Sequence, residues 1–128
     1  MPRFVILEHD HPTLHWDLML QAGETLRTWR LARAPIHPGD AIEATAIGDH
    51  RPMYLDYEGP VSGGRGKVGR WDHGTYEEEK PGIVRSEERV VIRLDGKRVQ
   101  GLAILERVAG DKWSFRITGS SPNDSAQG

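Results

Sequence analysis

The chain has 128 residues, a formal net charge of −2 with its histidines neutral, and no cysteine. This length allows one domain with a buried core, and the charge gives no sign of a polycation that binds nucleic acid through its bulk electrostatics. The absence of cysteine excludes disulfides, thiolate catalysis and cysteine-ligated metals, so any metal must be held by nitrogen and oxygen atoms.

The N-terminal apolar run, Phe4 to Leu7, is too short for a signal peptide or a membrane span. We therefore expect a soluble cytoplasmic protein that does not bind a membrane. No linker or internal repeat divides the chain. We expect one domain over residues 1–118 and a disordered tail over 119–128, where small and polar residues dominate.

Period-2 alternation and turn residues dominate the chain, and little of it fits a helix. The segments expected to form strands are 3–8, 15–21, 25–31, 41–47, 67–71, 74–77, 89–94, 98–106 and 112–118. Ala22-Gly23-Glu24 predicts one turn, and Asp95-Gly96 predicts a hairpin. About eight short strands joined by hairpins predict an all-β fold, either a sandwich or a barrel. We expect a small closed or partly closed antiparallel β-barrel with a polar active-site cavity.

Three histidines and two aspartates lie within residues 9–17. His15 and Asp17 are two apart on an expected strand and therefore project from one face, while His9 ends the preceding strand. Pro12 and Thr13 favour a bend that returns His9 to the side of His15. Two imidazoles and a carboxylate form a metal site with open positions for water or substrate. The alternative is a set of surface histidines in a polar turn.

Two further clusters carry candidate chemistry. His50 and Tyr54 could bind a phosphate through hydrogen bonds, with His50 as a general acid, or they could form a turn with a packed tyrosine. Arg65, Lys67 and Arg70 lie in a glycine-rich stretch that could approach a polyanion or could form an ordinary solvated loop. Its spacing matches neither a P-loop nor a Rossmann fingerprint.

Several segments together carry a family resemblance. They are Phe4-Val5-Ile6-Leu7-Glu8-His9, Leu14-His15-Trp16-Asp17-Leu18, Leu26-Arg27-Thr28-Trp29, Asp49-His50 with Tyr54, Asp56-Tyr57-Glu58-Gly59 and Trp71-Asp72-His73-Gly74-Thr75-Tyr76. In this order, over roughly residues 4–107, the chain resembles the 3′-phosphoesterase domain of bacterial DNA ligase D. That domain belongs to the non-homologous end-joining system and also occurs as small stand-alone proteins.

The resemblance implies a small β-barrel with a metal in its cavity. It also implies a manganese-dependent phosphoesterase that acts on 3′ ends of DNA or RNA–DNA strands. Such enzymes remove a 3′-terminal ribonucleoside and then the remaining 3′-phosphate, which leaves a 3′-hydroxyl. Carried over by position, His9, His15 and Asp17 are the metal ligands, and His50 and Tyr54 contact the phosphate. Zinc or cobalt could replace manganese. The implied partners are the DNA or RNA–DNA ends and ligase or other end-joining proteins; the oligomeric state stays open.

The chain departs from the family pattern mainly in its cations. Met19 stands where the family has a phosphate-contacting arginine, two residues after the metal aspartate. The family lysine after the conserved tryptophan corresponds to Arg33, which keeps the charge but not the shape. Ile42 or Glu43 occupies another position that is usually basic. The missing charge could come from Arg51, Arg65 or Lys67.

These departures leave two other readings open. The protein could be a weakened relative that binds DNA ends or a repair partner without turnover. It could also be an iron-dependent oxygenase built on two histidines and one carboxylate. In that class the second histidine usually lies far downstream, and no distal histidine here is more compelling than His9.

Overall fold

The structure, a computed structural model, describes residues 1–118. The elements in chain order are β1 (Arg3–His9), β2 (His15–Ala22), β3 (Thr25–Leu31), β4 (Ile42–His50), the 3-10 helix η1 (Pro52–Leu55), β5 (Gly59–Pro60), β6 (Lys67–Glu78), the 3-10 helix η2 (Ile83–Arg85), β7 (Arg89–Gly96), β8 (Gln100–Ala109) and β9 (Lys112–Thr118). No helix in the described part of the chain is long and apolar enough to cross a membrane. The tail expected to be disordered lies outside the described residues.

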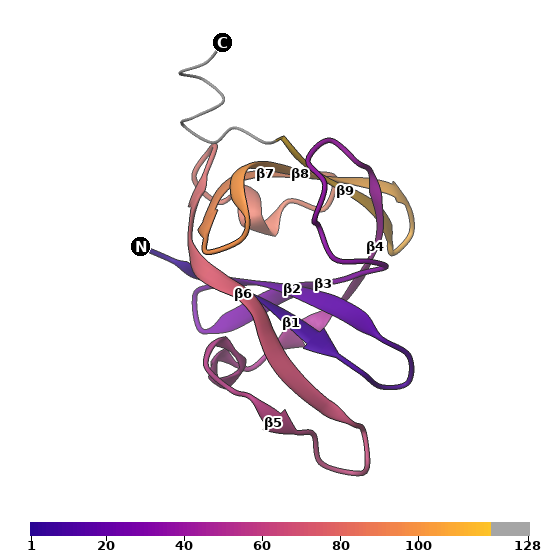
Figure 1. Cartoon of the computed structure of the whole chain (residues 1–128). Helices are drawn as coiled ribbons and strands as arrows, with labels where there is room; N and C mark the ends of the chain where they lie inside the picture. The colour runs from indigo at the N-terminus through magenta and orange to yellow at the C-terminus, as the bar shows by residue number, and fades with distance from the viewer. Residues whose placement is uncertain (119–128) are drawn as a thin grey trace.

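The strands form one antiparallel sheet that closes on itself. Their order is β1-β2-β3-β4-β9-β8-β7-β6-β5, and β6 also pairs with β1 (Figure 1). With the two-residue β5 left outside the ring, eight of the nine strands complete the barrel. The all-β barrel predicted from alternation and hairpin turns is therefore confirmed. Closure leaves the ring without an unpaired edge.

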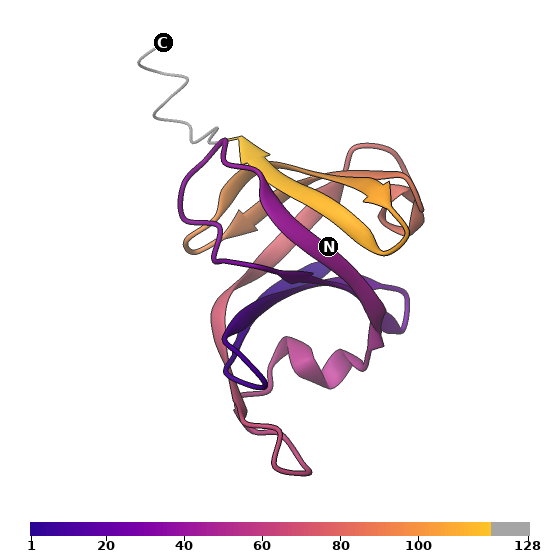
Figure 2. The same cartoon turned by 90° about the vertical axis from the view of Figure 1, so that its right-hand side faces the viewer.

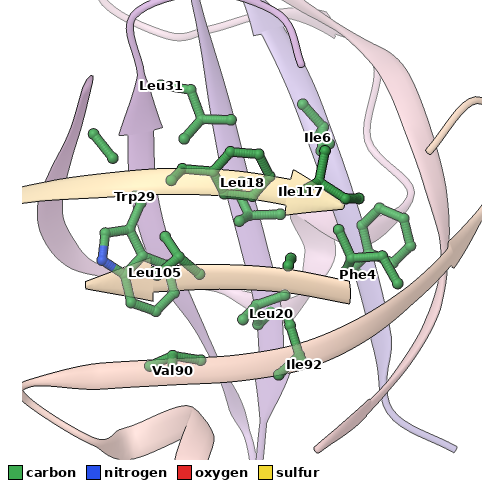
Figure 3. Close-up of a cluster of buried hydrophobic side chains, with 14 of the residues drawn as sticks. Phe4, Ile6, Leu18, Leu20, Trp29, Leu31, Val90, Ile92, Leu105 and Ile117 are labelled. Carbon is green, nitrogen blue, oxygen red and sulfur yellow. The ribbon is translucent and has the colours of Figure 1, made fainter. Parts of the chain in front are cut away.

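The interior of the barrel is apolar. Side chains from β1, β2 and β3 face those of β7, β8 and β9 across it, as the close-up of Phe4, Leu18 and Leu105 shows (Figure 3). Within it the Trp29 and Trp113 rings meet edge to face with centroids 5.4 Å apart. This filling leaves the inside of the barrel as a packed core, so a polar pocket has to lie elsewhere.

A second apolar cluster lies on the outer face of the same strands. Val5, Leu7 and Met19 alternate along β1 and β2 with the residues of the main core, and they pack with Leu26, Leu55 and Val68. The segment from β4 to β6, which includes η1, covers this face of β1 to β3 (Figure 2). The chain thus has a second, smaller layer outside the barrel, and the candidate site lies there.

Two expected strands prove to be one. Residues 67–71 and 74–77 belong to the twelve-residue strand β6. Its register on β1 shifts between Ile6 and Leu7, which pair with Asp72 and Arg70. The sequence pattern breaks there because the strand carries a bulge, not because the strand ends. The expected strand over residues 41–47 is also longer and runs to His50.

The β7–β8 hairpin turns later than expected. Asp95 and Gly96 belong to β7, and Asp95 pairs with Gln100. The buried Asp72 carboxylate accepts the backbone N–H groups of Lys97, Arg98 and Val99 at 2.8–3.1 Å. It also accepts its neighbour's N–H, from His73. A carboxylate from another strand therefore fixes where this turn falls.

Candidate metal centre and its pocket

The His9–His15–Asp17 group is built by the β1–β2 hairpin. His9 and His15 are Cα partners across the two strands, and Asp17 pairs with Leu7 two residues further along. Residues two apart on a strand share a face, so the three side chains project to the outer side of the barrel. The bend expected at Pro12 and Thr13 lies between the strands and brings His9 back beside His15.

The three side chains converge closely enough to hold one ion. One ligand atom from each residue lies within 4.8 Å of the others. The His15 Nε2 atom is 3.4 Å from Asp17 Oδ2, and the His9 Nδ1 atom is 4.0 Å from the same oxygen. His15 and Asp17 are each only 4% exposed. The carboxylate therefore sits in a desolvated position between two imidazoles.

Backbone carbonyls orient both imidazoles. His9 donates its Nε2–H to the Arg65 carbonyl, and His15 donates its Nδ1–H to the Thr13 carbonyl, each at 2.8 Å. In the neutral rings these bonds leave lone pairs on His9 Nδ1 and His15 Nε2. Both lone pairs then face Asp17. A carbonyl on the second ring nitrogen is the arrangement that fixes the tautomer of metal-ligating histidines.

Two buried polar atoms of this group lack partners. Neither His15 Nε2 nor Asp17 Oδ1 has a hydrogen bond from any described residue. Leaving a buried acceptor unpaired costs about 1–3 kcal/mol, and more for a charged one. A divalent cation that accepts lone pairs from these residues would satisfy them. The donor set of two imidazoles and one carboxylate suits manganese, zinc or cobalt.

A pocket of about 220 Å³ opens beside the group. It is lined by Leu7, His9, His11, Pro12, Asp17, Met19, Arg30, His50, Tyr54, Val61, Arg65 and Val68. The pocket combines the apolar floor of the outer layer with a rim of ionisable side chains. A larger cavity of about 270 Å³, around Thr75 and Arg93, shares no lining residue with this pocket, and no histidine is among its described lining residues.

His50 and Tyr54 both line this pocket. Their rings pack edge to face with centroids 5.8 Å apart. His50 lies at the end of β4 and donates its Nδ1–H to the Gly48 carbonyl at 2.9 Å, which leaves Nε2 for a pocket ligand. The Tyr54 hydroxyl makes no hydrogen bond to the described residues. Both groups are therefore placed to bind an anion that enters the pocket.

The expected phosphate-binding cations separate into two groups. Arg65 lines the pocket, but its guanidinium bonds back to the Ser62 carbonyl at 2.8 Å. Arg33 lines a different hollow, beside Trp16, and donates to the Ala41 carbonyl. Arg51 and Lys67 are exposed and do not line the pocket. The structure thus brings only Arg65 of these four to the site.

Arg30 is the cation that the sequence analysis missed. It lines the pocket, and its Nε atom lies 3.7 Å from Asp17 Oδ1. Arg30 and Asp17 are Cα partners across β2 and β3. The signal was present, because a two-residue turn at Gly23 and Glu24 places residue 30 opposite residue 17 in the hairpin. Met19, at the expected arginine position, is 1% exposed and belongs to the apolar floor.

Charged pairs hold the η1 segment and β4 around the pocket. Asp56, just after η1, accepts from Arg3 at 2.6 Å and lies 3.8 Å from Arg70. The hydrogen bond from Arg3 holds the pKa of Asp56 below its ordinary value. Asp49, next to His50, pairs with Arg85 at 2.9 Å. These pairs connect the pocket-forming segment to β1, β6 and η2.

The loop that carries Arg65 contacts the loop that follows His9. The Lys67 backbone N–H donates to Asp10 Oδ1 at 2.9 Å, and this bond lowers the pKa of Asp10. Gly66 has φ +73°, and a Cβ there would meet Asp10 Oδ1 at 2.1 Å. A glycine at this position therefore lets the loop come close enough for the Arg65 carbonyl to reach His9.

Comparison with known proteins gives a consistent match. The profile of the family described as DNA Ligase D 3′-phosphoesterase domain matches residues 7–107. The multifunctional non-homologous end joining DNA repair protein LigD of Mycobacterium tuberculosis is 33% identical over 115 residues, covering 86% of this chain and 15% of the relative. LigD of Pseudomonas aeruginosa is 28% identical over 106 residues, covering 77% and 12%. LigD of Mycolicibacterium smegmatis is 29% identical over 122 residues, covering 87% and 16%. The chain therefore spans about a sixth or less of the length of these relatives.

Proposed function

This chain belongs to the family of DNA ligase D 3′-phosphoesterase domains, and we propose that it is a metal-dependent phosphoesterase that processes 3′ ends of DNA or RNA–DNA strands. It would remove a 3′-phosphate, a 3′-terminal ribonucleoside, or both, and leave a 3′-hydroxyl for repair by non-homologous end joining. The observation that carries the proposal is the His9–His15–Asp17 group, whose buried His15 Nε2 and Asp17 Oδ1 atoms are unpaired among the described residues, beside a pocket that also holds His50 and Tyr54.

The metal would be held by His9 Nδ1, His15 Nε2 and the Asp17 carboxylate. A bound divalent cation polarises a phosphoryl oxygen and lowers the pKa of a coordinated water. The Arg65 and Thr13 carbonyls keep the two imidazoles in the ligating tautomers. We propose Mn²⁺, since a mixed imidazole and carboxylate set suits it, with Zn²⁺ or Co²⁺ as substitutes.

His50 and Tyr54 would bind and orient the phosphoryl group. When it carries a second proton, His50 donates from Nε2 to a phosphoryl oxygen or passes that proton to the leaving oxygen as a general acid. The Tyr54 hydroxyl donates to a second oxygen. Both donors are held in place before substrate arrives, His50 by its hydrogen bond to the Gly48 carbonyl and Tyr54 by edge-to-face contacts with the rings of His50 and Tyr57. Such preorganised donors stabilise the charge that develops in the transition state.

The direct test uses purified protein, Mn²⁺ and a primer–template that ends in a 3′-phosphate. We expect release of inorganic phosphate, and from a primer ending in one ribonucleotide we expect release of the terminal nucleoside. His9→Ala and Asp17→Ala should each lower the rate at least about 100-fold, because each removes a metal ligand. The matched control is His37→Ala, which changes a histidine outside the pocket and should leave the rate unchanged. Wild-type protein that releases no product with Mn²⁺, Zn²⁺ or Co²⁺ would contradict the proposal.

A second candidate is a DNA-end-binding module of the same fold with weak or no turnover. The observation that favours it is the buried Met19 where the family arginine is expected. Tight binding of a DNA end without product release would support this reading. Gain of turnover in Met19→Arg would then show that only the missing charge prevents catalysis. The partners under either reading would be DNA or RNA–DNA ends and ligase or end-joining proteins.

A further inference from the structure

Arg30 lines the pocket and was not among the cations expected to bind phosphate. It lies on β3 opposite Asp17, and its side chain is 44% exposed. Its one recorded ion-pair contact among the described residues is the 3.7 Å approach of Nε to Asp17 Oδ1. This distance is longer than a hydrogen bond. Neither terminal guanidinium nitrogen of Arg30 has a hydrogen-bond or ion-pair partner among the described residues, so both stay available to a ligand.

The other guanidinium of the pocket is already committed. Arg65 donates through Nε to the Ser62 carbonyl at 2.8 Å and lies 3.3 Å from the Ser62 hydroxyl through a terminal nitrogen. The backbone carbonyl of Arg65 also accepts the hydrogen bond from His9. Arg30 has neither constraint, and its strand is held rigidly by pairing on both sides. Of these two arginines, Arg30 is the one prepared for an incoming anion.

We propose that the Arg30 guanidinium binds the non-bridging oxygens of the substrate's terminal phosphate and thereby selects 3′-phosphate ends. This inference rests on the proposed function for its reaction, but the binding step can be tested without it. A divalent cation and Asp17 together carry a charge of +1, and Arg30 raises this to +2. A terminal phosphate carries about −1.5 to −2 at neutral pH, whereas a phosphodiester carries −1. The charge of the site with Arg30 therefore matches a phosphate monoester.

A purely structural role would have a different signature. If Arg30 only oriented Asp17, its removal would disturb the carboxylate and weaken metal binding. If Arg30 binds phosphate, its removal takes a positive charge away from the metal site and leaves metal affinity unchanged or slightly higher. Metal affinity and phosphate recognition therefore separate the two roles.

The experiment compares wild type with Arg30→Ala, Arg30→Lys and the control Arg116→Ala, an exposed strand arginine on β9 away from the pocket. Fluorescence anisotropy with Mn²⁺ measures the affinity for a labelled primer–template whose 3′-phosphate end is a non-hydrolysable methylenephosphonate and for the same duplex ending in a 3′-hydroxyl. Calorimetry measures Mn²⁺ affinity. Steady-state kinetics with Mn²⁺ measure turnover of 3′-phosphate and 3′-ribonucleotide ends.

We expect wild type and Arg116→Ala to prefer the 3′-phosphate end, and Arg30→Ala to lose about 10- to 100-fold of that affinity, the value of hydrogen bonds to a charged group. Arg30→Lys should lose less. In turnover, Arg30→Ala should slow release of the 3′-phosphate more than release of the ribonucleoside. Unchanged preference in Arg30→Ala would overturn the inference, as would a matching loss of Mn²⁺ affinity.

The outcomes also distinguish this inference from the proposed function. A preference that depends on Arg30 without any turnover would support the inference and contradict the proposed function. Turnover that does not depend on Arg30 would support the proposed function and contradict the inference. Wild type that shows neither preference nor turnover would overturn both.

Discussion

Asp17 has an environment that is costly without a cation. Its carboxylate is 4% exposed, and the Oδ1 atom has no hydrogen bond from the described residues. His15 Nε2, which lies 3.4 Å from the other carboxylate oxygen, is also buried without a hydrogen bond from the described residues. Burying an ionised carboxylate without full pairing costs several kcal/mol. Such local instability at a concave surface is typical of a site that binds a ligand.

Metal binding should therefore stabilise the folded protein. At a Mn²⁺ concentration about 100 times its Kd, the stabilisation should be about 2.7 kcal/mol, or a rise in Tm of about 10 °C for a domain of this size. Asp17→Asn should reduce this shift to less than about 2 °C, because the amide is a poor ligand and adds donors to a site that needs acceptors. Differential scanning fluorimetry with and without EDTA measures both shifts.

The control for this shift is Asp111→Asn, which changes an exposed carboxylate in the β8–β9 turn. It should keep the whole wild-type response to Mn²⁺. An equal shift in Asp17→Asn would mean that the stabilising ion binds at another place in the chain. No shift in wild type would mean that the group binds no Mn²⁺ in the concentration range tested.

The convergence of His9, His15 and Asp17 could be predicted from the sequence, because the period of a strand fixes which side chains share a face. His15 and Asp17 needed only this rule, and His9 needed only the bend before His15. The hairpin register also places Arg30 opposite Asp17. The family pattern expects its cation at position 19, which is Met19 here, and so it does not point to Arg30. Lys67 and Arg33 lie outside this pocket, because nearness in sequence to a glycine-rich loop or a tryptophan does not set the direction of a side chain.

At the scale of elements, an exposed ion pair adds to the attachment of η1, whose Leu55 side chain also packs in the outer apolar cluster. The pKa of Asp56 lies below its ordinary value because Arg3 donates to it. A depressed folded-state pKa means that the pair stabilises the attachment above the ordinary carboxylate pKa of about 4. The contribution is lost as pH falls through the lower pKa of the folded state. Because Tyr54 lies on η1, this attachment also bears on the pocket.

We therefore predict an acid transition confined to η1 and its neighbours. In wild type, the NMR signals of the backbone amides of Tyr54 and Leu55 should move as pH falls below about 4, where the Asp56 carboxylate takes up a proton. In Asp56→Asn the same signals should already lie near their acid positions at pH 7 and should not titrate. The control Asp111→Asn should titrate as wild type does. A transition that persists in Asp56→Asn would assign it to another carboxylate.

Elements whose ends depend on distant residues could not be located from local sequence. Asp95-Gly96 fits a two-residue hairpin turn, but Asp72 on β6 binds the N–H groups of residues 97–99 and moves the turn beyond it. The long strand β6 looked like two strands, because the bulge opposite Ile6 and Leu7 interrupts its alternation. Both differences come from tertiary hydrogen bonds that override local propensity.

For the whole molecule, alternation predicted the barrel but not the side on which the site lies. Along β1, Phe4 and Ile6 face the main core, while Val5 and Leu7 face the outer layer. Both faces of this strand are apolar, so the sequence pattern cannot show which face lies inside the barrel. The expected cavity within the barrel is instead an external pocket, since apolar side chains fill the interior.

Closure of the barrel places a steric demand on β6, which pairs with β1 on one side and β7 on the other. Gly74 pairs with Phe4 and with Gly96, and a Cβ at Gly74 would lie 2.0 Å from the Asp95 carbonyl oxygen. Gly74→Ala must therefore push β6 and β7 apart, and we expect it to lower the free energy of unfolding by about 3 kcal/mol. Gly48→Ala is the control, because its Cβ would meet nothing within 4 Å. It should change stability by less than about 0.5 kcal/mol. Urea unfolding measures both, and equal midpoints would show that the closing strands can separate without cost.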